Sequence, residues 1–303
     1  MAGLRRKPRA RRYPALSQEE EGKWKGPFVF ILGADTQFGL KDSYSGIAEH
    51  ERTWKDEIDW AKVAVKAANE MRPKPRFFVV CGDMIDAFPG TRNYDEQYRD
   101  FKTVFDELDN EIPLICVCGN HDIGNQPTVE GISKYRNSYG DDYYSFWVGG
   151  VLFITVNSQY YYNSSLKSLR DVQDTWLDKQ LELAAIAKHV VIFQHIPLFV
   201  KHADEDEHYG NFPTEERSKM LKKLKNAGVR YVFAGHYHRN AGGFHGNLEM
   251  IVTSAIGFPL GDDENGIRIV TVMEEKITHE FVSLNEIPKS VEDWEGCIRT
   301  CYC

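Results

Sequence analysis

Polar residues that can bind metal ions or transfer protons follow directly after five short apolar runs of this sequence. These clusters read Asp35-Thr36-Gln37, Gly82-Asp83-Met84-Ile85-Asp86, Gly119-Asn120-His121-Asp122, Gln194-His195 and Gly235-His236-Tyr237-His238. A single cluster of this kind is typical of a turn, but five in the same context are improbable as a coincidence. In open α/β sheets ligands bind outside the carboxyl ends of the strands, so we expect the clusters to converge on one crevice.

The clusters contain side chains of the kinds that bind divalent metal ions. Two ions about 3.5–4 Å apart can hold a phosphoryl group between them and generate a hydroxide nucleophile at neutral pH. Two ions, two carboxylates and a bridging hydroxide leave a net charge of about +1, which attracts a phosphate. The candidate ligands, enough for two ions that share a bridging carboxylate, are Asp35, Gln37, Asp83, Asn120, His195, His236 and His238.

One histidine of these clusters is left over after the ligands are assigned. His121 lies between Asn120 and Asp122, close to the metal positions, and suits a general acid that protonates a leaving alkoxide. Such a histidine needs a carboxylate to orient it and favour its charged form. Asp86 is the first candidate for that role and Asp122 the second.

The elements that must position these residues are visible in the apolar pattern. The five runs are short and rich in β-branched residues, which predicts buried strands. Stretches with helical periodicity over 58–71, 172–188 and 214–227 alternate with them, which favours an α/β fold with parallel strand pairing. Thr214 is the predicted N-cap of the last helix, and Gly228 is expected to end it. The predicted strands are Phe28–Leu32, Phe77–Cys81, Leu114–Cys118, Val190–Phe193 and Tyr231–Ala234.

Other stretches predict antiparallel strands in the same fold. Gly149-Gly150 between two apolar stretches, 143–148 and 151–156, predicts a hairpin with a two-residue turn. A late group of strands is expected at 250–252, 267–273 and 277–282. We therefore expect a mixed sheet or two sheets covered by helices. The chain contains no internal repeat, linker or shift in composition, which favours a single domain.

Charge and hydropathy exclude several classes of protein. The chain has 303 residues and a formal charge of −8, but residues 1–12 hold six basic and no acidic side chains, so the other 291 residues carry −14. This net negative charge argues against a nucleic-acid partner. No stretch approaches the roughly 18 consecutive apolar residues of a membrane span, so no membrane partner is expected. The basic N-terminus is interpreted as a disordered tail.

Cysteine use and the N-terminal sequence indicate the compartment. No apolar segment of the kind found in secretory signals follows the basic N-terminus. We therefore expect a cytoplasmic protein whose six cysteines are free thiols. Cys297, Cys301 and Cys303 match no strong metal or redox spacing and are interpreted as part of a loose C-terminal tail.

The ordered set of motifs resembles the calcineurin-like metallophosphoesterase superfamily over roughly residues 28–283. The matching patterns are Asp-x-Gln, Gly-Asp-x-x-Asp, Gly-Asn-His-Asp, a lone histidine and Gly-His-x-His, in this order. The resemblance implies a four-layer α/β/β/α sandwich with two mixed sheets and a dimetal site at their carboxyl edges. It implies a phosphoesterase domain at 24–285, between tails at 1–23 and 286–303.

The resemblance also implies roles for the individual residues. Asp35, Gln37, Asp83 and His238 would hold the first metal, and Asp83 would bridge to the second. Asn120, His195 and His236 would complete the second site, with His121 as proton donor paired with Asp86. The implied activity is hydrolysis of phosphomonoesters, foremost phosphoserine and phosphothreonine in protein substrates. The oligomeric state stays open.

The sequence departs from the family pattern at several positions. Gln37 stands where many members have histidine, and its harder amide oxygen favours Mn²⁺ or Mg²⁺, although Fe and Zn²⁺ remain candidates. Ala87 follows Asp86 where phosphoprotein phosphatases have an arginine, so a phosphate-binding arginine has to come from elsewhere; Arg239 and Arg136 are candidates. Asp86 occupies the position of the metal-bound tyrosine of purple acid phosphatases, which argues against that type.

These departures keep two alternatives open. The first is a phosphodiesterase or nucleotide phosphohydrolase on the same site, because the arginine is missing. The second is a metal-loaded binding module with little turnover, against which the intact His121 and Asp86 count. The acidic segment 201–213 follows the His195 cluster and is either a substrate-selecting loop near the site or a solvated connection.

Overall fold

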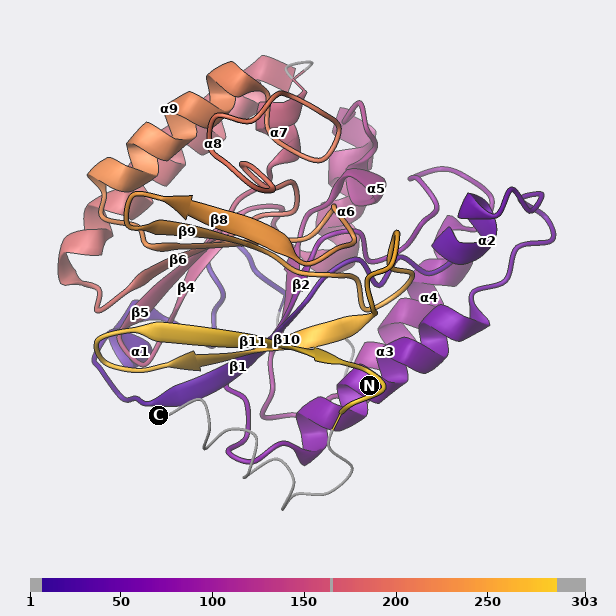
Figure 1. Cartoon of the computed structure of the whole chain (residues 1–303), viewed down its shortest axis with the longest axis horizontal. Coiled ribbons are helices and arrows are strands. Elements are labelled where there is room, and N and C mark those ends of the chain that lie inside the picture. Colours follow the sequence, from indigo (N-terminus) through magenta and orange to yellow (C-terminus); the bar gives the residue numbers. More distant parts are fainter. Residues whose placement is uncertain (1–6, 164–165, 288–303) are drawn as a thin grey trace.

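Two mixed β-sheets face each other in the computed structural model, which describes residues 7–163 and 166–287. Helices cover the outer face of each sheet, so the molecule has four layers in the order α/β/β/α (Figure 1). The predicted fold class is therefore confirmed. In the described part of the chain, none of the helices has both the length and the apolar character that crossing a bilayer requires.

The first sheet has five strands in the order β11-β10-β1-β2-β3. Strands β1, β2 and β3 are parallel, whereas β10 pairs antiparallel with both β1 and β11. All five were expected from the apolar pattern within a few residues. Their bounds are β1 Phe28–Gly33, β2 Phe78–Cys81, β3 Leu114–Val117, β10 Gly266–Val272 and β11 Ile277–Ser283.

The second sheet has six strands in the order β4-β5-β6-β7-β9-β8. The β4–β5 hairpin forms as predicted, and its turn residues Gly149 and Gly150 have φ of 53° and 85°, as a two-residue primed turn requires. Strand β8 was not predicted, because its two glycines disfavour a strand assignment. The bounds are β4 Tyr144–Val148, β5 Val151–Thr155, β6 Val190–Phe193, β7 Tyr231–Ala234, β8 Ala241–His245 and β9 Leu248–Val252.

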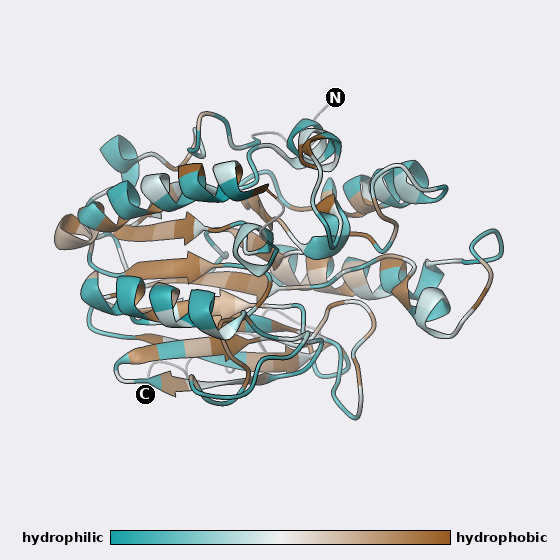
Figure 2. Ribbon diagram, turned by 90° about the horizontal axis from the view of Figure 1, so that it is seen from above, coloured by the Kyte–Doolittle hydropathy of each residue, from teal (hydrophilic) through white to brown (hydrophobic). Residues whose placement is uncertain are grey.

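The space between the sheets is filled by aromatic and aliphatic side chains. In β1, Phe28, Phe30 and Leu32 pack into this inner layer, while the alternate residues Val29 and Ile31 pack beneath the helices on the other side. This period of two is that of a strand buried on both faces. Figure 2 shows the consequence: most strands are largely hydrophobic, and hydrophilic residues gather on the helices outside them.

The helices form two outer layers. Residues of α3, α4 and α6 pack on the first sheet, and residues of α8 and α9 pack on the second. The predicted helix at 172–188 begins earlier and changes to a 3₁₀ turn, and Thr214 is the first helical residue rather than the N-cap. The bounds are α1 Gln18–Glu21, α2 Leu40–Tyr44, α3 Lys55–Glu70, α4 Tyr94–Phe105, α5 Asn120–Ile123, α6 Val129–Tyr139, α7 Gln159–Tyr162, α8 Lys167–Leu181, η2 Glu182–Ile186 and α9 Thr214–Asn226.

The N-terminal segment differs from the disordered tail that the basic composition predicted. From residue 7 onward it is packed, and Tyr13 and Leu16 are buried. The segment bonds to strand β4 through its main chain, and the Arg11 guanidinium lies 2.9 Å from the buried Asp142 carboxylate. Strand pairing and a buried counter-charge therefore hold a segment whose composition alone indicated solvation. Residues 1–6, and the C-terminal cysteines within 288–303, lie outside the described residues.

Candidate active site

The candidate residues lie where strands of both sheets end. They follow the carboxyl ends of β1, β2, β3, β6 and β7, as Asp35 and Gln37, Asp83 and Asp86, Asn120 and His121, His195, and His236 and His238. Strands β1, β2 and β3 run parallel, as do β6 and β7, so each sheet delivers its residues to one edge. The structure brings all nine together, as the strand-end pattern predicted.

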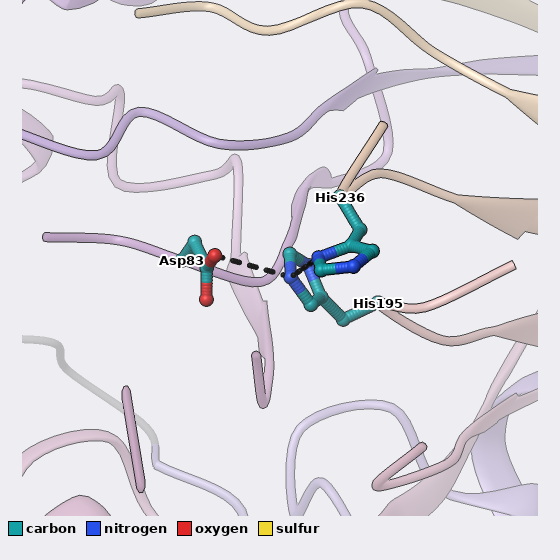
Figure 3. Close-up of side chains that lie close together, drawn as sticks. All are labelled: Asp83, His195 and His236. Carbon is teal, nitrogen blue, oxygen red and sulfur yellow. Dashed lines mark hydrogen bonds and ion pairs between the residues drawn. The ribbon is translucent and has the colours of Figure 1, made fainter. Parts of the chain in front are cut away.

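The centre of the cluster is formed by Asp83, His195 and His236. Their donor atoms all lie within 4.8 Å of one another, and all three side chains are buried. His195 lies between the other two (Figure 3): its Nε2 is 3.1 Å from Asp83 Oδ2 and 3.2 Å from His236 Nδ1. A carboxylate and two imidazole nitrogens at this spacing are a common donor set for divalent ions.

The remaining candidate ligands extend this cluster on two sides. Asn120 Oδ1 lies 2.9 Å from His195 Nε2. On the other side, His238 Nε2 lies 3.3 Å from Asp35 Oδ1, and the Asp35 carboxylate accepts the His236 main-chain N–H at 2.9 Å. The Asp83 carboxylate accepts the main-chain N–H of His121 at 2.8 Å. The donors therefore form one continuous, buried group rather than separate pockets.

Five of the seven candidate ligands have a left-handed backbone. Such conformations cost a non-glycine residue on the order of 1–3 kcal/mol and cluster at functional sites. The surrounding hydrogen bonds hold them; for example, the main-chain N–H groups of Asp35 and Gln37 bond to the carbonyls of Gly82 and Asp83. The five values of φ are 51° for Asp35, 33° for Gln37, 51° for Asp83, 68° for His236 and 53° for His238.

The glycines of the motifs make room for the site side chains. A Cβ on Gly82 would lie 2.2 Å from His195 Nδ1, and one on Gly119 would lie 2.2 Å from Asp83 Oδ1. A Cβ on Gly235 would lie 2.5 Å from Asp35 Oδ2. Each of these three glycines thus leaves room for a site side chain that follows a different strand.

Main-chain carbonyls fix the orientation of each site histidine. The Nδ1–H of His195 donates to the Cys81 carbonyl at 2.8 Å, and the Nδ1–H of His238 donates to that of Phe258 at 2.7 Å. His236 instead donates its Nε2–H to the Tyr209 carbonyl at 2.9 Å. The other nitrogen of His195 and of His238 faces a carboxylate, and that of His236 faces His195 Nε2 at 3.2 Å. This is the arrangement that orients imidazoles as metal ligands.

The charges of the cluster act strongly on one another. Burial alone would raise the pKa of Asp83, but the neighbouring His195 and His121 outweigh it and hold that pKa well below its usual range. Burial alone would lower the pKa of His195, yet Asp83 raises it to about 9. For His236, burial and the charge of His195 lower the pKa to about 4. The pKa of His238 is raised, because Asp35 overcomes the effect of burial.

His121 and Asp86 lie together beside this cluster. The Nδ1–H of His121 donates to the main-chain carbonyl of Asp86 at 2.6 Å, and the Asp86 carboxylate lies 3.5 Å from the same nitrogen. Within the described residues Nε2 has no hydrogen-bond partner, so it is available to a leaving group. The ring is held from the side by Phe88, with centroids 4.6 Å apart and near-parallel planes.

Asp122, the second candidate partner of His121, has a different role. Its carboxylate accepts the main-chain N–H groups of Gly119 at 2.7 Å, Asp83 at 3.0 Å and Met84 at 3.2 Å. It thus ties the ends of β2 and β3 together beneath the site. Burial and the neighbouring Asp83 raise its pKa.

Gln37 offers an unsatisfied oxygen to the site. Its Nε2 donates to Asp86 Oδ1 at 3.3 Å, but its buried Oε1 has no hydrogen-bond partner. A buried amide oxygen without a partner is costly and calls for a specific explanation. A metal ion on the Asp35–Asp83 side would satisfy it. Together with the oriented imidazoles, this orphan oxygen shows that the residues present fit divalent ions.

Sequence reasoning missed two side chains that border the site. Arg52 lies 3.9 Å from Asp86 Oδ2, and no motif marks it. Tyr209 comes from the acidic segment 201–213; its hydroxyl accepts the Asn120 Nδ2–H at 3.3 Å, and the residue is 59% exposed. The segment therefore borders the site. Of the candidate arginines, Arg136 is bound to Asp142 at 2.7 Å and stabilises the fold instead.

Comparison with known proteins agrees with this geometry. The family model for calcineurin-like phosphoesterases matches residues 34–240, the span that contains every candidate residue. The chain belongs to this family, which implies divalent metal ions and hydrolysis of phosphate esters. It is 49% identical to the serine/threonine-protein phosphatase CPPED1 of Homo sapiens over 96% of this chain and 95% of that protein, and 43% identical to that of Danio rerio over 94% and 93%.

Solved structures show the same fold at low sequence identity. A dimetal phosphatase from Danio rerio has a TM-score of 0.64 at 18% identity, covering 86% of this chain and 97% of that one. A purple acid phosphatase from yellow lupin (Lupinus luteus) has a TM-score of 0.63 at 12% identity, covering 88% of this chain and 53% of that one. At these identities the likeness concerns the fold alone.

Proposed function

We propose that this protein is a cytoplasmic, dimetal phosphomonoesterase that removes phosphate from phosphoserine and phosphothreonine in proteins. The observation that carries the proposal is the buried donor cluster of Asp83, His195 and His236, with His121 beside it. Relatives 43–49% identical over more than nine-tenths of the chain carry the name of serine/threonine-protein phosphatase. We propose residues 24–285 as the catalytic domain, although the packed segment before it contributes to the fold.

In this proposal the chain's own residues have distinct tasks. One ion would be held by Asp35, Gln37, Asp83 and His238, and the other by Asn120, His195 and His236 together with Asp83. Bound divalent ions supply a positive field for the phosphoryl group and lower the pKa of a bound water. His121 holds a proton on Nε2, directed by the bond from its Nδ1 to Asp86, and gives it to the leaving oxygen.

Placement in the cytoplasm is supported by the thiols. Cys81, Cys116 and Cys118 are free and buried among the described residues. Burial raises the pKa of each of these thiols, so they are unreactive core residues. Reduced thiols are typical of proteins in a reducing compartment.

A substrate panel tests the proposal. The metal-loaded protein is assayed with phosphoserine and phosphothreonine peptides, nucleotides, p-nitrophenyl phosphate and bis-p-nitrophenyl phosphate. We expect the phosphopeptides and the monoester to be hydrolysed with the highest kcat/KM. A preference for nucleotides or for the bis-ester would instead assign the site to a nucleotide phosphohydrolase or phosphodiesterase. Bound metal with no turnover on any substrate would identify a binding module.

Gln37 is expected to set the metal preference. Its amide oxygen is a harder ligand than imidazole, so we expect higher activity with Mn²⁺ or Mg²⁺ than with Zn²⁺. Gln37→His should shift the ratio of Zn²⁺ to Mn²⁺ affinity upward by about tenfold. Metal titrations of both forms, followed by metal content after dialysis, measure the shift. Equal or higher wild-type activity with Zn²⁺ would contradict this assignment.

A further inference from the structure

The proposed site contains few positive side chains for its substrate. Asp35, Asp83 and Asp86 bring three carboxylates, and the position after Asp86 is occupied by Ala87. A dianionic phosphoryl group binds best where a fixed cation or guanidinium fork meets its oxygens. An arginine of the described residues that reaches this region would supply such a group.

Neither of the two arginines singled out by the sequence makes such a contact. Arg136 is occupied by the buried Asp142 carboxylate. Arg239 lies over the Tyr237 ring, 4.9 Å from its centroid, and borders the turn at Gly261. No ion pair joins either of them to a candidate ligand, to His121 or to Asp86 within the described part of the chain.

Arg52 is the arginine that meets the site. It lies in the loop between α2 and α3, at the right of Figure 1. Its Nη1 is 3.9 Å from Asp86 Oδ2, and the other oxygen of this carboxylate accepts from Gln37 at 3.3 Å and faces His121 Nδ1 at 3.5 Å. Asp86 thus joins the guanidinium to both the proposed ligand set and the proposed proton donor.

Within the described residues, the Arg52 guanidinium is hydrogen-bonded along one edge only. Arg52 Nε donates to the Ile47 carbonyl at 2.9 Å, and the next residue, Thr53, is tied to Asp42 through its main-chain N–H at 2.7 Å. At 3.9 Å the contact with Asp86 is too long for a hydrogen bond. The terminal nitrogens therefore keep their donor capacity, and the side chain remains 26% exposed. A fork held at its base with free donors is pre-organised for an anion.

We propose that Arg52 binds the terminal oxygens of the phosphoryl group and selects phosphomonoesters over phosphodiesters. A monoester offers three terminal oxygens and up to two negative charges. A diester has only two such oxygens and a single charge. Fewer oxygens and less charge are therefore available to an arginine that shares the phosphoryl group with other cations. This inference rests on the proposed function, because it names the substrate class of the same site.

The test compares two substrates across matched variants. We expect Arg52→Ala to lower kcat/KM for p-nitrophenyl phosphate by about 100-fold and for bis-p-nitrophenyl phosphate by less than about threefold. The inhibition constant of inorganic phosphate should rise in parallel, and calorimetry should show weaker phosphate binding to the metal-loaded variant. Arg52→Lys should recover only part of the loss, because it restores the charge but not the fork.

Arg99→Ala is the matched control. The exposed Arg99 also donates its Nε–H to a main-chain carbonyl, that of Asp95 at 3.2 Å, but this carbonyl does not belong to a site residue. This variant should leave kcat/KM for both substrates and the amount of bound metal unchanged. Equal losses on the two esters, loss of bound metal in Arg52→Ala, or a selective monoester loss in Arg239→Ala would overturn the inference. These results concern the ratio of the two esters, so they are distinguishable from failure of the proposed function, which the wild-type substrate panel reveals.

Discussion

Asp83→Asn is expected to remove at least one metal ion and nearly all activity. Asp83 uses both of its carboxylate oxygens within the site: Oδ2 lies 3.1 Å from His195 Nε2, and Oδ1 accepts the His121 main-chain N–H at 2.8 Å. An amide has one oxygen instead of two and no charge. We expect metal affinity to fall by more than about 100-fold and kcat/KM by about 1,000-fold or more. Metal content after dialysis and steady-state kinetics measure both.

Asp142→Asn separates this effect from general damage to the fold. Asp142 is also a buried aspartate, but it binds Arg11 and Arg136 instead of the site residues. Its loss leaves two partly buried arginines without this carboxylate, which should lower the unfolding temperature while the folded protein retains its metal. The reverse result, full metal content in Asp83→Asn, would remove Asp83 from the ligand set.

The arrangement of the site was predictable because it follows from topology. Parallel strands in one sheet end at the same edge, so polar residues placed after Phe28–Leu32, Phe77–Cys81 and Leu114–Cys118 must meet there. The apolar runs and the residues that follow them are local features of the sequence. The meeting of the clusters could therefore be inferred before any coordinates, whereas the four layers were expected from the family resemblance alone.

The contacts that orient the site could not be inferred in the same way. The carbonyls of Cys81, Tyr209 and Phe258 accept hydrogen bonds from histidines 114, 27 and 20 positions away in the sequence. Every residue has a main-chain carbonyl, so the residue type does not indicate which carbonyl will have this role. Arg52 is equally unmarked, because its place depends on a loop held by Asp42 and Ile47.

The N-terminal segment shows how composition alone misled the prediction. Six basic residues within the first twelve indicated a solvated tail. Composition does not show which part of the fold the segment can bind. Strand β4 is an edge strand, and its outer main-chain groups form hydrogen bonds with the N-terminal segment. Asp142 then neutralises Arg11. Long-range pairing of this kind overrides a local charge pattern.

The last prediction concerns proton transfer to the leaving group. His121→Asn should lower kcat for phosphoserine and phosphothreonine peptides by about 100- to 10,000-fold, because a serine or threonine alkoxide leaves poorly without a proton. The loss should be much smaller for p-nitrophenyl phosphate, whose leaving phenolate is stable. Bound metal should be unchanged, since the imidazole of His121 is not among the proposed ligands.

The dependence on the leaving group is what distinguishes an acid from a positioning residue. His202→Ala, at an exposed histidine in the loop that borders the site, is the control and should leave both substrates unaffected. Asp86→Asn should show the same dependence on the leaving group as His121→Asn but a smaller loss, because the main-chain carbonyl that holds His121 Nδ1 at 2.6 Å is retained. An equal loss on peptide and p-nitrophenyl substrates in His121→Asn would mean that this residue holds the phosphoryl group rather than supplying the proton.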